Sequence, residues 1–189
     1  MKHTRKWLTL LLALLVGCGA MGAGAEEGFL TVDQGWKYTG YTPGGVTFAI
    51  PLDFESYDTS LFDRMAGILI LGGNADFTLQ LRQFSPDTMT YAEFAARIQA
   101  EPTARWGTRM DGGSEILWYR NTAATANSEL FGIALTGLDG MLYKISIFTG
   151  DGEDYSPDAR VWALAETIAQ TVRHQDFAEW SITDEAAAD

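Results

Sequence analysis

Few side chains in this 189-residue sequence have the chemistry of a proton-transferring catalyst. Histidine is the residue that most readily exchanges protons near neutral pH. The sequence has two histidines, of which His3 lies in the basic start of the chain and His174 near the end. The apolar spacing before His174 places it in the last turn of a helix, where a cation complements the helix dipole. We therefore interpret His174 as a structural residue rather than a general base.

Carboxylates gather in the segment that follows the first predicted strand. Two carboxylates held at a fixed separation can hydrolyse a glycosidic bond. The sequence alone gives neither that separation nor a cleft, so a carboxylate-dependent hydrolase is the least favoured function. The members of this acidic cluster are Asp53, Glu55, Asp58 and Asp63.

A second acidic loop, DGEDYSPD, contains Asp151, Glu153 and Asp154. Oxygen ligands in a glycine-containing loop are what calcium prefers. The loop departs from the EF-hand pattern because Tyr155 stands at its fifth position and no glycine stands at its sixth. We interpret it as a solvated turn that leads into a helix, with these three carboxylates as weak metal candidates. No cofactor is expected.

The sequence contains none of the short motifs that mark common catalytic sites. A serine elbow of the form G-x-S-x-G, a phosphate-binding G-x-x-x-x-G-K-[ST] loop and an H-E-x-x-H zinc motif are all missing from it. The 13 basic residues stand against 25 acidic ones, giving a net charge of −12. Nucleic acid is not an expected partner, because phosphate binding needs a basic face. We expect a protein without enzymatic activity.

Aromatic side chains near the start of the predicted domain form the best candidate for a contact surface. Trp36 and Tyr38 alternate, and Tyr41 follows them. Exposed aromatic residues often anchor interfaces, so these three could stack on a sugar or on a partner protein. They could equally pack onto the edge of a sheet. Trp106, Trp118 and Trp162 lie inside periodic patterns and are expected in the core.

The first 25 residues are typical of a secretory signal peptide. A basic start is followed by the uncharged run WLTLLLALLV at 7–16 and by small residues. Two cleavage sites remain open. The sequence LVGC ending at Cys18 resembles a bacterial lipobox, which would lipidate Cys18 and remove residues 1–17. The sequence AGA ending at Ala25 would release a soluble product starting at Glu26.

Either cleavage makes the exported protein more acidic. Removal of residues 1–25 takes away three basic residues and no acidic one, so the net charge falls from −12 to −15. Cys18 is the sole cysteine of the sequence, so no disulfide is possible within the chain. We divide the remainder into a lead-in segment at 26–45, a single domain at 46–176 and an acidic tail at 177–189.

The domain begins with strand patterns, continues with one helix and a run of further strands, and ends with a second helix. Thr90 and Glu93 form a capping box before a helical pattern that Pro102 ends. Ser156 and Pro157 begin a second amphipathic helix. Both faces of the run 141–149 carry apolar residues, which favours a central strand. The strand-like runs are 46–50, 68–71, 77–84, 105–110, 115–121, 130–135 and 141–149. This order predicts an α+β fold with helices on an antiparallel sheet.

In these elements the chain resembles the PsbP-like α/β/α sandwich. The opening strand TFAIPLDF lies at Thr47–Phe54, FTLQL at Phe77–Leu81 precedes TYAEF at Thr90–Phe94, and YKISIF at Tyr143–Phe148 precedes the last helix. The resemblance covers roughly 46–173 and is one of pattern and order. It implies a secreted or membrane-tethered binding or assembly accessory, and it carries no site residues onto this chain.

Three functions follow, in order of preference. The first is an exported, non-catalytic accessory module of the bacterial cell envelope, tethered through lipidated Cys18 or secreted, that binds a protein partner. The second is a secreted protein that binds a glycan through the aromatic residues or a cation through the acidic loops. The third is the carboxylate-dependent hydrolase. A large exposed apolar patch would favour the first of these.

Overall fold

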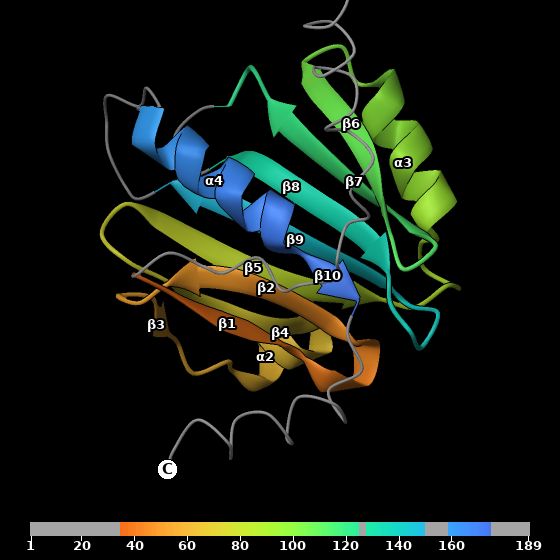
Figure 1. The fold of residues 1–189 in the computed structure, drawn as a ribbon. Helices are drawn as coiled ribbons and strands as arrows, with labels where there is room; N and C mark the ends of the chain where they lie inside the picture. The colour runs from red at the N-terminus through yellow and green to blue at the C-terminus, as the bar shows by residue number, and fades with distance from the viewer. Residues whose placement is uncertain (1–34, 125–127, 150–158, 175–189) are drawn as a thin grey trace, which may run out of the picture. The chain divides into compact units, whose positions relative to one another are not determined.

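A seven-stranded antiparallel sheet organises the fold (Figure 1). The computed structural model describes residues 35–124, 128–149 and 159–174, all within one compact unit, Val32–Asp189. The strand order is β3-β4-β5-β9-β8-β7-β6. The strands are β3 (Glu55–Ser56), β4 (Ile68–Gly73), β5 (Phe77–Phe84), β6 (Ala104–Asp111), β7 (Ser114–Asn121), β8 (Glu129–Thr136) and β9 (Leu142–Thr149). The predicted α+β class with an antiparallel sheet is confirmed.

Strand β9 occupies the central position of the sheet, as its sequence predicts. It pairs with β5 on one side and with β8 on the other. Tyr143, Ile145 and Ile147 belong to the main core on one face, and Leu142 belongs to a second core cluster on the other. The alternation of β5 is also confirmed, because its inward-facing residues Phe77, Leu79 and Leu81 are fully buried.

A smaller sheet with the order β1-β2-β10 packs against the main core. Strand β2 (Val46–Pro51) lies between β1 (Trp36–Tyr41) and β10 (Arg173–His174), and a single 3₁₀ turn, η2 (Thr42–Gly44), joins β1 to β2. Gly45 follows this turn with a φ of 61°, a conformation that glycine adopts without strain. Strand β1 lies in the predicted lead-in segment, where the sequence patterns indicate no strand.

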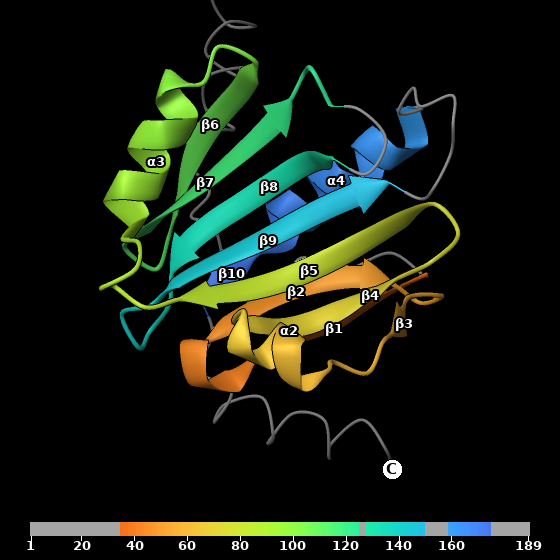
Figure 2. The same cartoon turned by 180° about the vertical axis from the view of Figure 1, so that it is seen from behind.

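Two helices cover opposite faces of the seven-stranded sheet, as Figures 1 and 2 show from the two sides. Helix α4 (Ala159–Thr171) places Ala165, Ile168 and Ala169 in the main core beside β2. Helix α3 (Tyr91–Ala100) packs Phe94 and Ala95 onto the other face. A five-residue helix, α2 (Leu61–Met65), precedes β4.

The start of α3 and the apolar stripe of α4 agree with the sequence where the structure describes them. Thr90 and Glu93 make both hydrogen bonds of the predicted capping box at the start of α3. The last apolar residue of the predicted α4 stripe, Val172, is also buried. Ser156 and Pro157 lie outside the described residues.

His174 does not lie in the helix, contrary to the sequence prediction. Helix α4 ends at Thr171, and the guanidinium of Arg109 donates to the carbonyls of Ala169 and Val172. These carbonyls are thereby satisfied without a further helical turn. The chain then extends into β10, where the His174 backbone N–H donates to Asp111 at 2.7 Å. The helix therefore stops because another strand satisfies its last carbonyls.

Trp106 is 44% exposed rather than buried in the core. It lies on β6, the edge strand of the seven-stranded sheet, opposite Tyr119 of β7. An edge strand has a neighbour on one side only, so its side chains are covered less completely. Trp118 and Trp162 are partly buried against the main core, as expected.

We predict that Thr171 ties α4 to β2 through one buried hydrogen bond. Its hydroxyl accepts from the backbone N–H of Ala49 at 3.0 Å. Thr171→Val keeps the side-chain shape but leaves that buried N–H without its acceptor, so the free energy of unfolding should fall by about 1–3 kcal/mol. Urea denaturation measures the change.

Thr167→Val is the matched control on the same helix. The Thr167 hydroxyl donates to the carbonyl of Ala163 in an exposed position, where water can replace it. We expect a change within about 0.5 kcal/mol. Equal destabilisation by the two variants would contradict the role assigned to Thr171.

Candidate functional site

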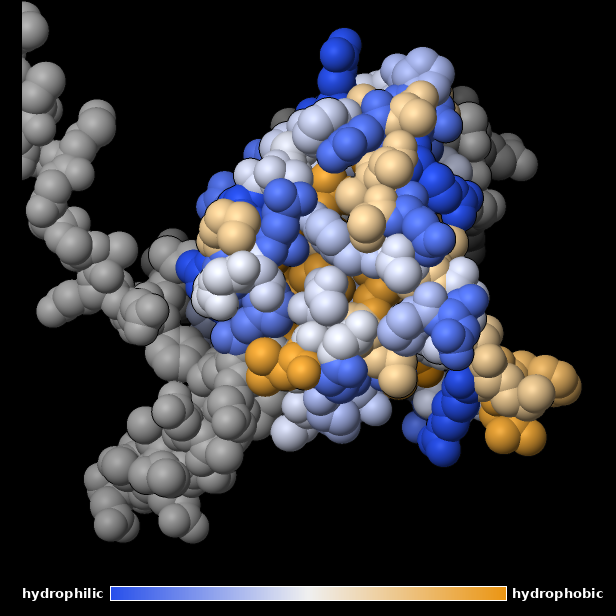
Figure 3. All heavy atoms as spheres, turned by 90° about the vertical axis from the view of Figure 1, so that its right-hand side faces the viewer, coloured by the Kyte–Doolittle hydropathy of each residue, from blue (hydrophilic) through white to orange (hydrophobic). Residues whose placement is uncertain are grey.

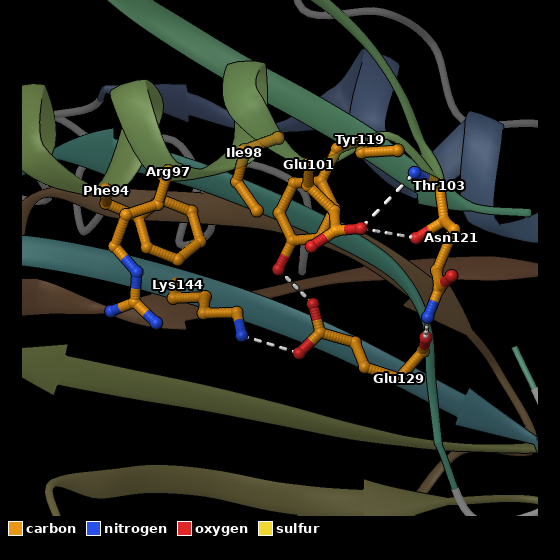
Figure 4. Close-up of a pocket in the computed structure, with 10 residues that line it drawn as sticks. Phe94, Arg97, Ile98, Glu101, Thr103, Tyr119, Asn121, Glu129 and Lys144 are labelled. Carbon is orange, nitrogen blue, oxygen red and sulfur yellow. Dashed lines mark hydrogen bonds and ion pairs between the residues drawn. The ribbon is translucent and has the colours of Figure 1, made fainter. Parts of the chain in front are cut away.

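A pocket of about 400 Å³ lies beneath α3, as Figure 4 shows. We call it the α3 pocket. Helix α3 and the link to β6 form one wall, and strands β6 to β9 supply the rest. Its lining residues are Phe94, Arg97, Ile98, Glu101, Thr103, Ala104, Tyr119, Asn121, Glu129 and Lys144.

Glu129 is the centre of the polar network in this pocket. Its carboxylate accepts hydrogen bonds from the phenol of Tyr119, from Lys144 at 2.5 Å and from Ser146 at 3.2 Å. These three donors come from β7 and β9, the two strands that flank β8. Burial of a carboxylate is costly unless it is paired and hydrogen-bonded. The arrangement meets that requirement for both Glu129 and Lys144.

Aromatic rings line the space around the Lys144 ammonium. Its Nζ lies 5.5 Å from the ring centre of Phe94 and 5.9 Å from that of Tyr119, within range of a cation–π attraction. The Tyr119 ring lies directly on the backbone of Gly132, where a Cβ atom would come within 2.2 Å of it. Glycine at this position of β8 therefore allows the Tyr119 ring to lie close to the strand at the bottom of the pocket.

Two charged groups at the mouth of the α3 pocket are only lightly engaged. Among the described residues, the sole polar contact of the Arg97 guanidinium is with the Met89 sulfur at 4.0 Å. One oxygen of Glu101 accepts from the backbone and hydroxyl of Thr103, at 3.3 and 2.8 Å. Figure 4 shows these two charges at opposite sides of the pocket, with Lys144 and Glu129 below them. The pocket thus offers both a cation and an anion to a ligand.

A second candidate surface is the apolar group on α2. Leu61, Phe62 and Met65 are 72%, 82% and 78% exposed, and we call them the α2 cluster. In the view of Figure 3, hydrophobic side chains project at the lower right, on the side where α2 lies. Helix α2 buries none of its own residues. Its apolar side chains therefore contribute nothing to the core.

Polar contacts hold α2 in place instead. Ser60 and Asp63 form a reciprocal capping box at its start, with Ser60 N–H donating to Asp63 at 2.8 Å. Beyond its end, Arg82 of β5 donates to the Ala66 carbonyl at 2.9 Å. The carbonyl of Gly67 accepts from the β5 backbone as well. The capping box stabilises the start of the helix, and the contacts with β5 hold the residues that follow its end. Its apolar side chains stay exposed to solvent.

The structure places the predicted aromatic residues on β1. Trp36, Tyr38 and Tyr41 are half-buried there, and Trp36 and Tyr41 pack against the main core. The Tyr41 ring lies 5.9 Å from that of Tyr143. Burial raises the pKa of Tyr38 above its ordinary value. The use of these residues as a contact surface stays a prediction.

The carboxylates of the first acidic cluster have separate roles. Asp53 accepts from the Asn74 amide at 3.2 Å, and Asp63 caps α2. Glu55 and Asp58 are exposed. Within the ranges that the structure describes, no three acidic, histidine or cysteine side chains are grouped to hold a metal. Cys18 and the calcium candidates Asp151, Glu153 and Asp154 lie outside the described residues.

His174 is engaged in packing rather than offered to a ligand. Its side chain is 7% exposed, and its Nε2 lies 2.6 Å from the Thr136 carbonyl. Its Nδ1 lies 3.4 Å from an Asp111 oxygen. The imidazole therefore joins β10 to the ends of β6 and β8, in agreement with a structural role.

Sequence analysis missed the residues of the α3 pocket. Lys144 carries the one available signal, because it is a charge in the middle of a strand with apolar residues on both faces. A buried lysine requires a nearby carboxylate. The sequence does not show which carboxylate that is, since Glu129 becomes its neighbour through the pairing of β8 with β9.

Comparison with known proteins shows a likeness of fold. No protein-family model matches this chain, and no curated protein matches it. Among solved structures it is similar to cyanobacterial PsbP from Synechocystis sp. PCC 6803, with a TM-score of 0.49 and 14% sequence identity, covering 82% of this chain and 99% of that one. The resemblance to a PsbP-like fold is confirmed at the level of pattern. It concerns the fold alone.

We predict that the proton held by Tyr119 makes the fold less stable at alkaline pH. Burial, and then the charge of Glu129 and the hydrogen bond to it, raise the pKa of Tyr119 far above its ordinary value near 10. Above about pH 10 the unfolded chain releases a proton that the folded chain keeps. The stability from this phenol is therefore complete below pH 10 and is lost as the pH rises further.

Tyr119→Phe isolates this contribution. It removes the titrating proton, so the free energy of unfolding should fall with pH less steeply, by about 1.4 kcal/mol in total between pH 9 and 11. Tyr91 and Tyr143 donate to Glu115 and Asp139, have raised pKa values, and contribute the same slope to both proteins. Denaturant titrations from about pH 9 to 11 measure the two slopes. Identical slopes would show that Tyr119 does not retain its proton.

Proposed function

We propose that this chain is a non-catalytic binding module that docks to a partner protein through the α2 cluster. The exposure of Leu61, Phe62 and Met65 on one short helix carries the proposal. Burying a side chain of this size contributes about 1.5–3 kcal/mol. A fold that leaves three of them in water forgoes that stabilisation, and an interface recovers it. The structural engagement of His174 supports a non-catalytic role.

The charges around α2 indicate the chemistry of the partner. Asp53, Glu55 and Asp58 precede the cluster in the chain, and all are exposed. The nearby Lys37 ammonium already donates to the carbonyls of Leu52 and Phe54. Arg64 lies on α2 itself and is also exposed, so charges of both signs accompany the cluster. An apolar projection of this kind fits an apolar groove with a polar rim. An anionic membrane surface is disfavoured by the net charge of −12.

Site-specific cross-linking tests the docking surface. With a photo-reactive phenylalanine analogue in place of Met65, we expect a single protein adduct in host cells. The cross-linked peptide should consist mainly of apolar residues. The same analogue in place of Leu138, which is 63% exposed in the β8–β9 turn, is the control and should give no such adduct.

Phe62→Ser then measures the contribution of the cluster. Once the partner is isolated, this variant should bind it at least 2 kcal/mol more weakly, roughly the loss expected at an interface hot spot. Its unfolding free energy should stay within about 0.5 kcal/mol of the parent, because the side chain is exposed. An adduct to lipid or to a second copy of the chain, or no adduct at position 65, would overturn the docking proposal.

We also propose that the module is exported and held at the bacterial envelope by a lipid on Cys18. The signal-like pattern of residues 1–25 and the LVGC sequence support this. Two acyl chains give stable anchoring where one is marginal. Described residues contain no helix long and apolar enough to cross a bilayer.

Intact mass of the mature protein decides the mode of attachment. We expect a membrane-bound product that begins at a diacylated Cys18, and we expect Cys18→Ser to abolish both the lipid and the membrane fraction. A soluble product beginning at Glu26 would refute the lipid anchor while leaving export in place. A full-length product with residues 1–17 intact would refute both cleavage routes.

A further inference from the structure

We propose that the α3 pocket binds a small zwitterion with an apolar body, as an apolar α-amino acid is. In this assignment Arg97 and Lys144 hold the carboxylate, and Glu101 holds the ammonium. Phe94 and Ile98 contact the apolar side chain. This site is separate from the α2 cluster and does not depend on the docking proposal.

The carboxylate end is assigned from the two cations. The Arg97 guanidinium lines the pocket without an ion pair in the described part of the chain, so its planar fork is open to a bidentate carboxylate. The Lys144 ammonium has three donor protons, and its one described hydrogen bond goes to Glu129. Both groups line the pocket on the side opposite to Glu101 (Figure 4).

The ammonium end is assigned from the carboxylates. The three donors on Glu129 come from the protein itself, so this residue is already neutralised and hydrogen-bonded. Glu101 is different, because the bonds from Thr103 reach only Oε1. Its other oxygen is available to a cationic group at the mouth of the pocket.

Overall charge favours a neutral ligand over a simple anion. Two basic and two acidic side chains line the pocket, so their formal charges cancel. The whole chain carries a net charge of −12, which repels anions from solution. A zwitterion experiences no such net repulsion and still satisfies both local charges. The volume of about 400 Å³ and the aromatic floor leave room for an apolar side chain.

Calorimetric titration of the full domain with L-phenylalanine tests the assignment. Two half-ligands provide the chemical controls: 3-phenylpropionate lacks the ammonium, and phenethylamine lacks the carboxylate. We expect saturable binding of L-phenylalanine, and binding of each half-ligand weaker by about tenfold or more, the effect of one charge-assisted hydrogen bond.

Substitutions assign the two ends. Arg97→Met and Glu101→Gln should each weaken L-phenylalanine binding by about tenfold or more. The amide oxygen that Glu101→Gln introduces can still accept from Thr103, so the local fold is kept. Arg105→Met and Glu55→Gln make the same charge changes at exposed positions outside the pocket and should leave binding unchanged. Phe62→Ser in the α2 cluster should also leave it unchanged.

Three results would overturn the proposal. The first is absence of binding at millimolar L-phenylalanine. The second is equal binding of 3-phenylpropionate with no effect of Glu101→Gln, which would describe a carboxylate site instead. The third is an equal loss of L-phenylalanine affinity in Arg97→Met and Arg105→Met, which would show that the affinity depends on the net charge of the chain rather than on a contact with Arg97.

Discussion

The covering of both faces of β9 is the constraint on which this structure depends. One face supplies Tyr143, Ile145 and Ile147 to the main core beneath α4 and the small sheet. The other face turns toward α3 and carries Lys144. A charge in that position has to be paired. Glu129 on β8 supplies the paired carboxylate, and the phenol of Tyr119 donates a hydrogen bond to it. Gly132 leaves room for the Tyr119 ring that makes this contact.

Local patterns determine the elements that the sequence predicts correctly. Alternation in β5, the Thr90–Glu93 capping box and the apolar stripe of α4 involve neighbours within a few residues. Strand β10 depends on a distant partner instead, because it pairs with β2. Strand β10 has two residues, and it forms because it pairs with β2 and because the His174 N–H donates to Asp111. No local period can reveal a strand of that length.

The α3 pocket escapes sequence reasoning for the same reason. Arg97 lies on α3 and Glu101 directly follows it, but Glu129 and Lys144 come close to them only through the order of the strands. Asp63 and Arg64 interrupt the α2 cluster in the sequence, and no periodic pattern there indicates whether its apolar residues are buried or exposed. Its exposure results from the capping box and the contact with Arg82, which hold the helix without burying its side chains.

The two candidate surfaces break the rule of apolar inside and polar outside in opposite directions. Lys144 and Glu129 are charges beneath a helix, and Leu61, Phe62 and Met65 are hydrophobic residues in water. Each departure is offset locally, by hydrogen bonds in the first case and by helix capping in the second. Natural sequences depart from such consistency chiefly at functional sites. The hydrogen bonds and the helix cap explain how the fold tolerates these residues. The packing of the core does not require them. Binding is the role that we propose for both.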